Sequence, residues 1–188
     1  MILVTGSSGL IGYRLCAKLA SENIVVRGFD LRATGTEQGD IRRPDQIRAA
    51  IKGCSGIVHL AAVSRVIWGE RDPAGCWETN VGGLKHILDA ASSQLRKPWI
   101  LFTSSREVYG QPKSLPADET AQMDPLNIYA KSKVEAERLM FKARESGYQT
   151  AVLRLSNVYG STRDHVDRVV PAFARAAAHG EILRVEGS

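Results

Sequence analysis

The first twelve residues carry the feature that most limits the fold of this chain. A short apolar run, Met1 to Val4, leads into Thr5-Gly6-Ser7-Ser8-Gly9-Leu10-Ile11-Gly12 and then into a stretch of helical periodicity. Between a strand and a helix, such glycines permit a tight turn, close approach of backbone to a pyrophosphate, and helix–strand packing. The helix N-terminus adds free N–H groups for phosphates. A plain glycine-rich turn is the alternative, but we expect dinucleotide binding by Gly6, Ser8, Gly9, Leu10, Ile11 and Gly12.

Short apolar runs alternate with longer amphipathic stretches along the rest of the chain. Several runs are apolar throughout, as in strands buried on both faces, and Pro44 and Pro73 stand at plausible helix starts. This alternation predicts an α/β fold of the Rossmann type, a doubly wound parallel sheet with helices on both faces. The expected strands span residues 2–5, 24–30, 57–61, 99–104 and 150–155, and the expected helices 10–21, 44–52, 73–94 and 127–146.

Composition and charge exclude several classes of function. The chain has 188 residues, of which 44% are hydrophobic and 24% charged, enough for one domain or for one domain and a fragment of another. Its net charge of +5 comes from dispersed basic residues, which favours a phosphate-bearing small molecule over nucleic acid. Three distant cysteines suit reduced thiols, and four histidines lack metal-ligand spacing. Without a leader or a membrane-length apolar run, a cytoplasmic protein with no membrane partner is expected.

A carboxylate at the expected end of the second strand bears on the choice of cofactor. Asp30 lies where a carboxylate accepts the ribose hydroxyls of NAD and repels the 2′-phosphate of NADP. An aspartate in a strand-end turn would look the same, and Arg32 could hold that phosphate, but NAD is the better match. Asp40 and Ile41 are expected to flank the adenine, with a simple loop-to-helix turn as the alternative.

Tyr129-Ala130-Lys131-Ser132-Lys133 supplies the residues that nicotinamide chemistry needs. Tyr129 and Lys133 are four apart and therefore share one face of a helix. A nearby ammonium favours the phenolate, so that Tyr129 can take or give a hydroxyl proton. Ser105 ends the expected strand before this helix and can hydrogen-bond the reacting oxygen. An exposed helix face is the alternative for an isolated Tyr-x-x-x-Lys, but the combination with the glycine turn predicts a catalytic site.

Taken in order, these stretches resemble a known family. They are joined by Gly39-Asp40-Ile41, Val58-His59-Leu60-Ala61-Ala62, Glu78-Thr79-Asn80-Val81-Gly82, Thr103-Ser104-Ser105-Arg106-Glu107-Val108-Tyr109-Gly110 and Leu153-Arg154-Leu155-Ser156-Asn157-Val158-Tyr159-Gly160. The chain is identified as similar to the extended short-chain dehydrogenases/reductases of the NAD-dependent sugar-nucleotide epimerase/dehydratase family. The match covers nearly the whole chain but does not name a substrate.

The resemblance implies a role for each matching position. Tyr129 would be the acid/base, Lys133 would hold the nicotinamide ribose, and Ser105 would orient a sugar hydroxyl. The implied cofactor contacts, besides the glycine turn, are Asp30, Asp40, Ile41, Leu60, Ala61, Ala62, Asn80, Tyr129 and Lys133. A structural role for Asn80 is the alternative. The implied substrate contacts are Ser105, Arg106, Glu107 and Asn157.

Arg106 and Glu107 depart from the simplest family pattern. Glu107 fits a second acid/base, but Arg106 stands where family dehydratases carry an acid, and a solvated loop glutamate is the alternative. Epimerases and dehydrogenases need only Ser105, Tyr129 and Lys133.

The resemblance also implies an organisation into two parts. Residues 1–160 would form the NAD-binding domain with the catalytic residues, and residues 161–188 only the beginning of a small substrate-binding lobe. This second part is expected to hold a helix near 167–179 and a possible strand at 181–185. The chain would be a truncated or naturally short relative.

Two functions remain open at this point. The chain would act on a nucleotide sugar as an NAD-dependent oxidoreductase or isomerase through transient hydride transfer, or it would be a non-catalytic NAD-binding module or inactive fragment. Family members commonly dimerise through the helices expected at 73–94 and 127–146, which implies a homodimer here.

Overall fold

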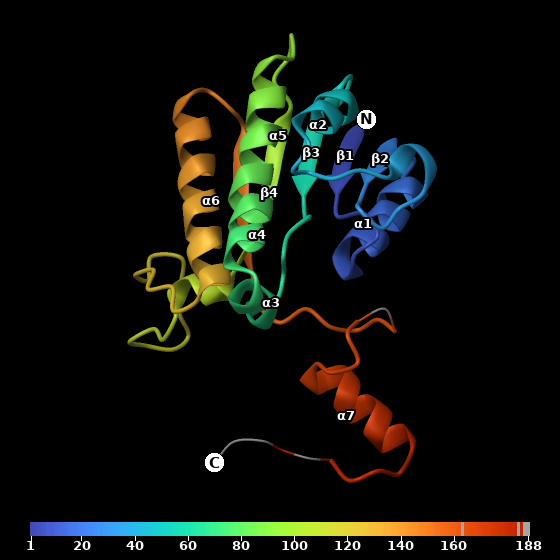
Figure 1. Ribbon diagram of the computed structural model, residues 1–188, viewed down its shortest axis with the longest axis vertical. Helices are drawn as coiled ribbons and strands as arrows, with labels where there is room; N and C mark the ends of the chain where they lie inside the picture. The colour runs from blue at the N-terminus through green and yellow to red at the C-terminus, as the bar shows by residue number, and fades with distance from the viewer. Residues whose placement is uncertain (163, 184, 186–188) are drawn as a thin grey trace. The chain divides into compact units, whose positions relative to one another are not determined.

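The structure is a computed structural model that describes residues 1–162, 164–183 and 185. It divides into two compact units, Met1–Ser156 and Asn157–Ser188. The first unit is built on a five-stranded sheet in the order β2-β1-β3-β4-β5, in which every pairing is parallel (Figure 1). The strands are β1 (Ile2–Thr5), β2 (Val26–Phe29), β3 (Gly56–His59), β4 (Trp99–Ser105) and β5 (Thr150–Leu155). The predicted parallel α/β fold is confirmed.

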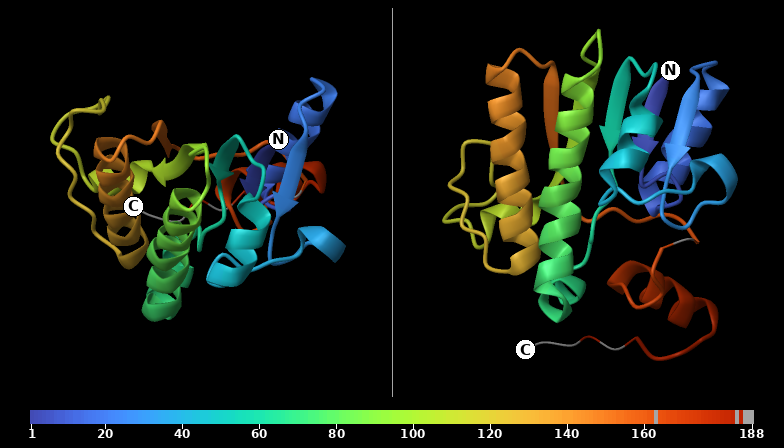
Figure 2. Two further views of the ribbon diagram at one scale, coloured as in Figure 1. Left: turned by 90° about the horizontal axis from the view of Figure 1, so that it is seen from above. Right: turned by 45° about the horizontal axis from the view of Figure 1, so that its top comes forward.

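Helices cover both faces of the sheet, as expected for parallel strands. Helix α1 (Leu10–Ser21) packs on β1 and β2 from one side. On the other side α2 (Pro44–Ile51), α5 (Gly83–Ser92) and α6 (Ile128–Glu145) lie along the sheet (Figure 2). Register places Leu3, Ile57 and Ile100 on this second side, where they are fully buried in the main core. Helices therefore enclose β1 on both sides, whereas β5 keeps exposed residues such as Leu153.

The strand order changes direction between β1 and β3, and this position matters for ligands. From β1 the chain moves outward to β2 and then returns past β1 to β3 and β4. In open α/β sheets, ligands bind beyond the carboxyl ends of the strands at such a switch point. The carboxyl ends of β1, β3 and β4 lead directly into the turn at Gly6, the segment at Leu60 and the segment at Arg106.

The helix expected at 73–94 is interrupted rather than uniform. It consists of α4 (Pro73–Trp77), a π-helical segment η2 (Glu78–Gly82) and α5. A short helix α3 (Val66–Arg71) and two 3₁₀ turns, η1 (Gly35–Glu37) and η3 (Arg106–Tyr109), were not predicted. Short helices of this kind rely on tertiary contacts, because isolated helices below about 12 residues are marginal in water.

The second unit contains α7 (Val169–Ala178), close to the helix predicted at 167–179. The strand predicted at 181–185 is wrong for the residues that can be judged, since 181–183 and 185 are irregular, and Arg184 lies outside the described residues. An edge strand needs a neighbouring strand to pair with, which sequence pattern alone does not supply. Among the described helices, none is both long enough and apolar enough to cross a bilayer.

Candidate active site

The glycine turn between β1 and α1 is closely packed. Gly6 adopts a positive φ of 73°, and an ideal Cβ placed on it would lie 2.7 Å from the main-chain nitrogen of Ala61. A Cβ on Gly12 would lie 2.1 Å from the carbonyl oxygen of Gly6. Gly9 is the N-cap of α1, and no side chain among the described residues caps that terminus. The turn therefore presents helix N–H groups at the switch point that no described side chain caps.

A polar atom without a partner lies inside the same turn. The hydroxyl of Ser7 is buried and makes no hydrogen bond with the described part of the chain. Unpaired buried hydroxyls are costly, so such an atom is a natural donor for a bound group. Together with the glycine cradle, it fits the phosphates of a dinucleotide.

Asp30 closes the turn from the end of β2. Its buried carboxylate accepts hydrogen bonds from the main-chain N–H of Ser8 at 3.0 Å and of Arg32 at 2.8 Å. Its interaction with the exposed Arg32 guanidinium is long, at 3.5 Å. A carboxylate has about four acceptor positions. Asp30 therefore holds the turn in shape and retains acceptor capacity for ribose hydroxyls.

Asp40 and Ile41 are fixed by different contacts. Arg42 binds the Asp40 carboxylate through its main-chain N–H at 2.9 Å and its guanidinium at 2.6 Å. These hydrogen bonds hold the pKa of Asp40 below its usual value. The Ile41 side chain belongs to the buried core, and its carbonyl oxygen lies 3.1 Å from Nδ1 of His86. Ile41 anchors Asp40 to the core, and its predicted contact with adenine stays a prediction.

Thr5 and His59 join the ends of β1 and β3 on either side of the switch point. Thr5 Oγ1 lies 2.7 Å from His59 Nδ1 and accepts the N–H of Ala61 at 3.3 Å. Burial lowers the pKa of His59 to about 3, and the positive charge of Lys133 acts in the same direction. His59 is therefore neutral and serves to fix the segment of Leu60, Ala61 and Ala62 against the glycine turn.

Asn80 lies in the π-helical segment and makes a structural bridge. Its Oδ1 accepts the N–H of Val63 at 2.8 Å, and its Nδ2 donates to Val63 O at 3.1 Å and to Ser132 Oγ at 2.9 Å. Ser132 Oγ in turn donates to the carbonyl of Tyr129 at 2.7 Å. The Asn80 side chain thus connects the segment after β3 to α6. This arrangement favours the structural alternative for the side chain, and its predicted cofactor contact stays untested.

Tyr129 and Lys133 lie on the buried face of α6. The Lys133 side chain reaches β4, where Nζ donates to Thr103 O at 2.8 Å and lies 4.8 Å from the Phe102 ring centroid and 5.9 Å from that of Tyr129. Lys133 is only 3% exposed, and burial lowers its pKa to about 8, with Cys76 and Glu137 acting in the opposite direction. This lysine therefore loses its proton near pH 8, well below the ordinary range of a lysine.

Ser105 ends β4, two residues beyond the carbonyl that binds Lys133. Its Oγ accepts the N–H of Glu107 at 3.2 Å and so caps η3. Glu107 pairs with the exposed Arg106 guanidinium at 3.1 Å and accepts from Asn127 Nδ2 at 3.3 Å. Both residues predicted to contact substrate beside Ser105 are thus engaged with the protein.

Some site residues were placed elsewhere or missed. Asn157 is exposed at the start of the second unit, and its predicted substrate contact stays a prediction. Glu137 was missed, although it follows Lys133 by four residues on the same helix face. It is fully buried and forms an ion pair with Arg154 of β5 at 2.7 Å. An acid at a core position of an amphipathic helix is the signal that reveals such a pair.

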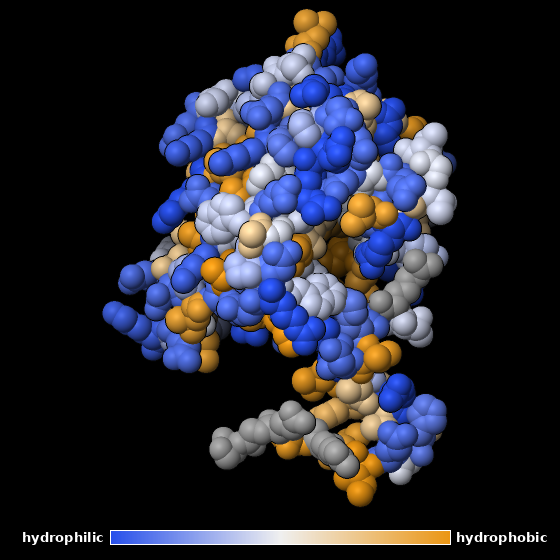
Figure 3. All heavy atoms as spheres, viewed as in Figure 1, coloured by the Kyte–Doolittle hydropathy of each residue, from blue (hydrophilic) through white to orange (hydrophobic). Residues whose placement is uncertain are grey.

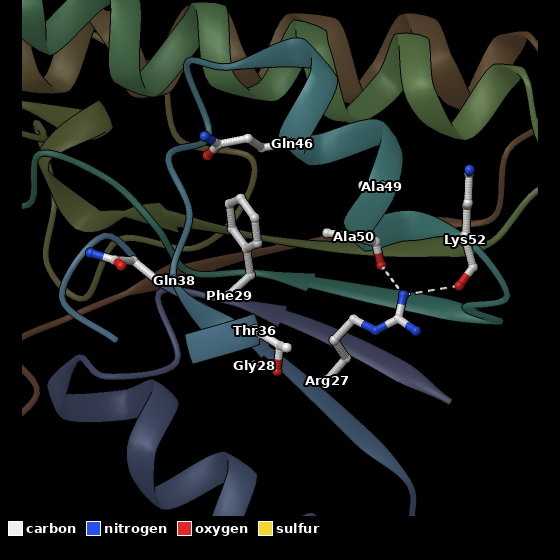
Figure 4. A pocket seen from close by; sticks show the side chains of 9 residues that line it. All are labelled: Arg27, Gly28, Phe29, Thr36, Gln38, Gln46, Ala49, Ala50 and Lys52. Carbon is white, nitrogen blue, oxygen red and sulfur yellow. Dashed lines mark hydrogen bonds between the residues drawn. The ribbon is translucent and has the colours of Figure 1, made fainter. Parts of the chain in front are cut away.

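A hollow lies beside the edge strand β2 (Figure 4), and Gln46, one of its lining residues, accepts the main-chain N–H of Asp40 at 2.8 Å. The hollow is lined by β2, α2 and the segment between them, and Arg27 donates to the carbonyls of Ala50 at 2.6 Å and Lys52 at 3.0 Å. These bonds satisfy carbonyls at the end of α2. Within the described ranges there is no group of three potential metal ligands.

The parallel sheet, the glycine turn at its switch point and the Tyr-x-x-x-Lys helix are those of an extended short-chain dehydrogenase/reductase. Within that class, the chain belongs to the NAD dependent epimerase/dehydratase family, whose model matches residues 2–188.

Individual relatives agree with this assignment. The chain is 34% identical over 166 residues to a 2-alkyl-3-oxoalkanoate reductase of Shewanella oneidensis, covering 82% of this chain and 42% of the relative. It is 32% identical over 173 residues to a UDP-glucose 4-epimerase of Rhizobium leguminosarum bv. trifolii, covering 85% and 52%. The crystal structure of UDP-glucose 4-epimerase from Brucella ovis in complex with NAD superposes with a TM-score of 0.85 at 28% identity, covering 95% and 61%. The chain spans about half the length of the curated relatives it matches.

Proposed function

We propose that this chain binds NAD and carries the catalytic residues of an oxidoreductase or isomerase that acts on a nucleotide sugar. The observation that carries the proposal is the position of Lys133. Its ammonium is buried on the Tyr129 face of α6 and donates to the carbonyl of Thr103, two residues before Ser105 on β4; the carboxyl end of β4 lies on the same side of the sheet as the glycine turn after β1. A buried cation is costly to the fold, and buried groups with shifted pKa values concentrate at functional sites.

The residues present fit a dinucleotide. The N–H groups at the start of α1 and the Ser7 hydroxyl would hold the pyrophosphate, and Asp30 would accept ribose hydroxyls. Asp40 would lie toward the adenine, with Leu60, Ala61 and Ala62 along the cofactor. When bound, NAD supplies the acceptor for a hydride.

Three side chains of the site would have separate roles in moving the proton of the substrate hydroxyl. The Tyr129 phenolate takes the proton of a sugar hydroxyl as the carbon is oxidised, and returns it when that carbon is reduced again. The Lys133 ammonium stabilises the phenolate electrostatically. The Ser105 hydroxyl hydrogen-bonds the reacting oxygen and keeps it in line with Tyr129. Were the hydride returned to the opposite face of the sugar carbon, the product would be an epimer.

Two relatives support this choice of substrate class. A curated relative in Rhizobium is a UDP-glucose 4-epimerase, and the Brucella epimerase was solved with NAD. The Shewanella relative is a reductase of 2-alkyl-3-oxoalkanoates, so that compound class belongs in any substrate screen. Asn157 would contact the substrate diphosphate, and residues 161–188 would form the beginning of the substrate-binding lobe.

The test combines NAD binding with turnover. Calorimetry with NAD and NADP is expected to give tighter binding of NAD, and a panel of UDP-, GDP- and dTDP-sugars is expected to show turnover that Tyr129→Phe abolishes. Tyr148→Phe is the matched control, because Tyr148 lies beyond the far end of α6 and its hydroxyl bonds Leu88 O at 3.4 Å. Binding of NAD without turnover that depends on Tyr129 would leave the alternative, a non-catalytic NAD-binding module.

We also propose a homodimer through α4–α5 and α6. The face that these helices present is mostly hydrophilic in Figure 3, and the large apolar side chains exposed on them are Trp77 and Phe141 in the described part of the chain. These two aromatic side chains would be the centre of the contact. Light scattering at micromolar concentration is expected to give the mass of two chains, and a monomer would contradict the proposal.

A further inference from the structure

The first turn of α6, which carries Tyr129, is held by side chains from two other segments. Figure 1 shows α3 and the start of α6 at the same end of the first unit, and both α3 and η3 contact α6. Glu70 of α3 accepts the N–H of Ile128 at 2.9 Å. A Cβ on the neighbouring Gly69 would lie 3.3 Å from Tyr129 Cβ, so α3 packs directly against the tyrosine.

The second support is a chain of hydrogen bonds that runs from Ser105 to this turn. Ser105 Oγ accepts the N–H of Glu107, and the Glu107 carboxylate accepts Asn127 Nδ2. Asn127 is the N-cap of α6, and its Oδ1 accepts the N–H of Ala130 at 2.8 Å. Because Oδ1 is committed to the helix, Nδ2 must face Glu107, which fixes the amide orientation.

These contacts distinguish two roles for Glu107. An acid/base would need a carboxyl group free to exchange a proton with substrate. Instead, one Glu107 oxygen accepts from Asn127 and the other faces the Arg106 guanidinium. Both contacts require only an acceptor, and the exposed Arg106 pair contributes little. Glu107 is thus built into a connection between the two catalytic hydroxyls.

Building on the proposed function, we infer that Glu107 is a positioning residue: through Asn127 it sets the first turn of α6, and hence Tyr129, relative to Ser105. It does not exchange a proton with the substrate. The spacing between these two hydroxyls determines whether both reach the same sugar oxygen, and a misplacement of about 1 Å costs on the order of 100-fold in rate.

The test exchanges the donor and the acceptor of the hydrogen bond between Asn127 and Glu107. Asn127→Asp keeps the cap, because aspartate is as good an N-cap as asparagine, but it turns a carboxylate toward Glu107 and breaks the bond. We expect kcat to fall about 10- to 100-fold with little change in the Kd for NAD. Adding Glu107→Gln to this variant supplies an amide donor for the new carboxylate and is expected to restore most of kcat. Glu135→Gln, on an exposed pair of the same helix, is the control that leaves kcat unchanged.

Single variants of Glu107 separate the two roles. Glu107→Gln keeps an acceptor for Asn127 and is expected to retain most of kcat, with an unchanged pH profile, whereas Glu107→Ala loses at least about tenfold. If Glu107→Gln is as impaired as Glu107→Ala, Glu107 is an acid/base and the inference fails. It fails equally if Glu107→Ala is fully active, or if the double variant does not recover.

A readout independent of turnover keeps this test separate from that of the proposed function. Asn127→Asp is expected to speed hydrogen exchange of the Glu107 amide, which bonds Ser105 Oγ, about fivefold, because the Glu107 side chain loses its bond to α6, and the double variant is expected to restore it. If the wild-type chain turns over no sugar, the proposed function fails, but hydrogen exchange still shows whether Glu107 connects Ser105 to α6. Unchanged exchange in Asn127→Asp overturns the inference even in an active enzyme.

Discussion

The buried Lys133 leads to a prediction about stability as a function of pH. Its folded-state pKa of about 8, against an ordinary value of 10.5, is caused mainly by burial. Because each pKa unit is worth about 1.4 kcal/mol, holding this ammonium inside the protein costs about 3 kcal/mol at pH 7. We therefore expect Lys133→Met to raise the free energy of unfolding at pH 7, by about 3 kcal/mol less the loss of the bond to Thr103.

The sign of the pH dependence follows from proton counts. Between pH 8 and 10.5 the unfolded chain holds a proton on Lys133 that the folded chain has lost, so the wild type gains stability as pH rises through this window. The cost is fully present below pH 8 and disappears above 10.5. The advantage of Lys133→Met should therefore shrink by about 2 kcal/mol between about pH 7 and pH 9.5.

Urea denaturation at several pH values, followed by circular dichroism, measures this difference directly. Comparing the variant with the wild type cancels every other titrating group that the substitution leaves alone. Lys131→Met is the control, because Lys131 is exposed on the same helix and no pH-dependent difference is expected from it. A stability difference for Lys133→Met that stays constant over this pH range would refute the argument.

Two further substitutions test the cofactor cradle and the buried ion pair. Gly12→Ala places a Cβ 2.1 Å from the Gly6 carbonyl oxygen. Calorimetry should therefore show NAD affinity reduced by more than about tenfold, or about 1.4 kcal/mol. The control is Gly82→Ala, whose Cβ would meet only Glu78 at 3.9 Å and which should bind NAD normally. Glu137→Leu leaves the guanidinium of Arg154 uncompensated, and urea denaturation should show a loss of about 3–5 kcal/mol, with at least half recovered when Arg154 is also changed to Leu. A loss below about 1 kcal/mol would show that this pair is not a buried charge pair in solution.

Sequence pattern was sufficient for the parts of the molecule that local chemistry decides. The apolar runs predicted all five strands, and Pro44 and Pro73 marked true helix starts because a proline needs no hydrogen-bond partner at the first helical position. Helical spacing alone placed Tyr129 and Lys133 on one face. These features depend on neighbours within about four residues, which the sequence lists in order.

Contacts between segments distant in the sequence could not be predicted from local pattern. The π-helical break at Glu78–Gly82 and the short α3 are stabilised by packing against α6, so the hydrophobic periodicity of the sequence did not predict them. The role of Glu107 depends on Asn127, twenty residues away, and that of Asn80 depends on Val63 and Ser132.

The amino-acid order by itself determined a parallel α/β sheet with a glycine turn after its first strand and a tyrosine–lysine pair on a later helix. Only the tertiary structure decided that Lys133 is buried against Thr103, that the Asp30 carboxylate braces the turn, and that Glu107 connects Ser105 to the helix of Tyr129. The physical reason is the distance along the chain over which each interaction acts. Backbone preference and hydrophobic periodicity act along the chain, whereas burial and hydrogen-bond geometry arise when segments far apart in sequence meet.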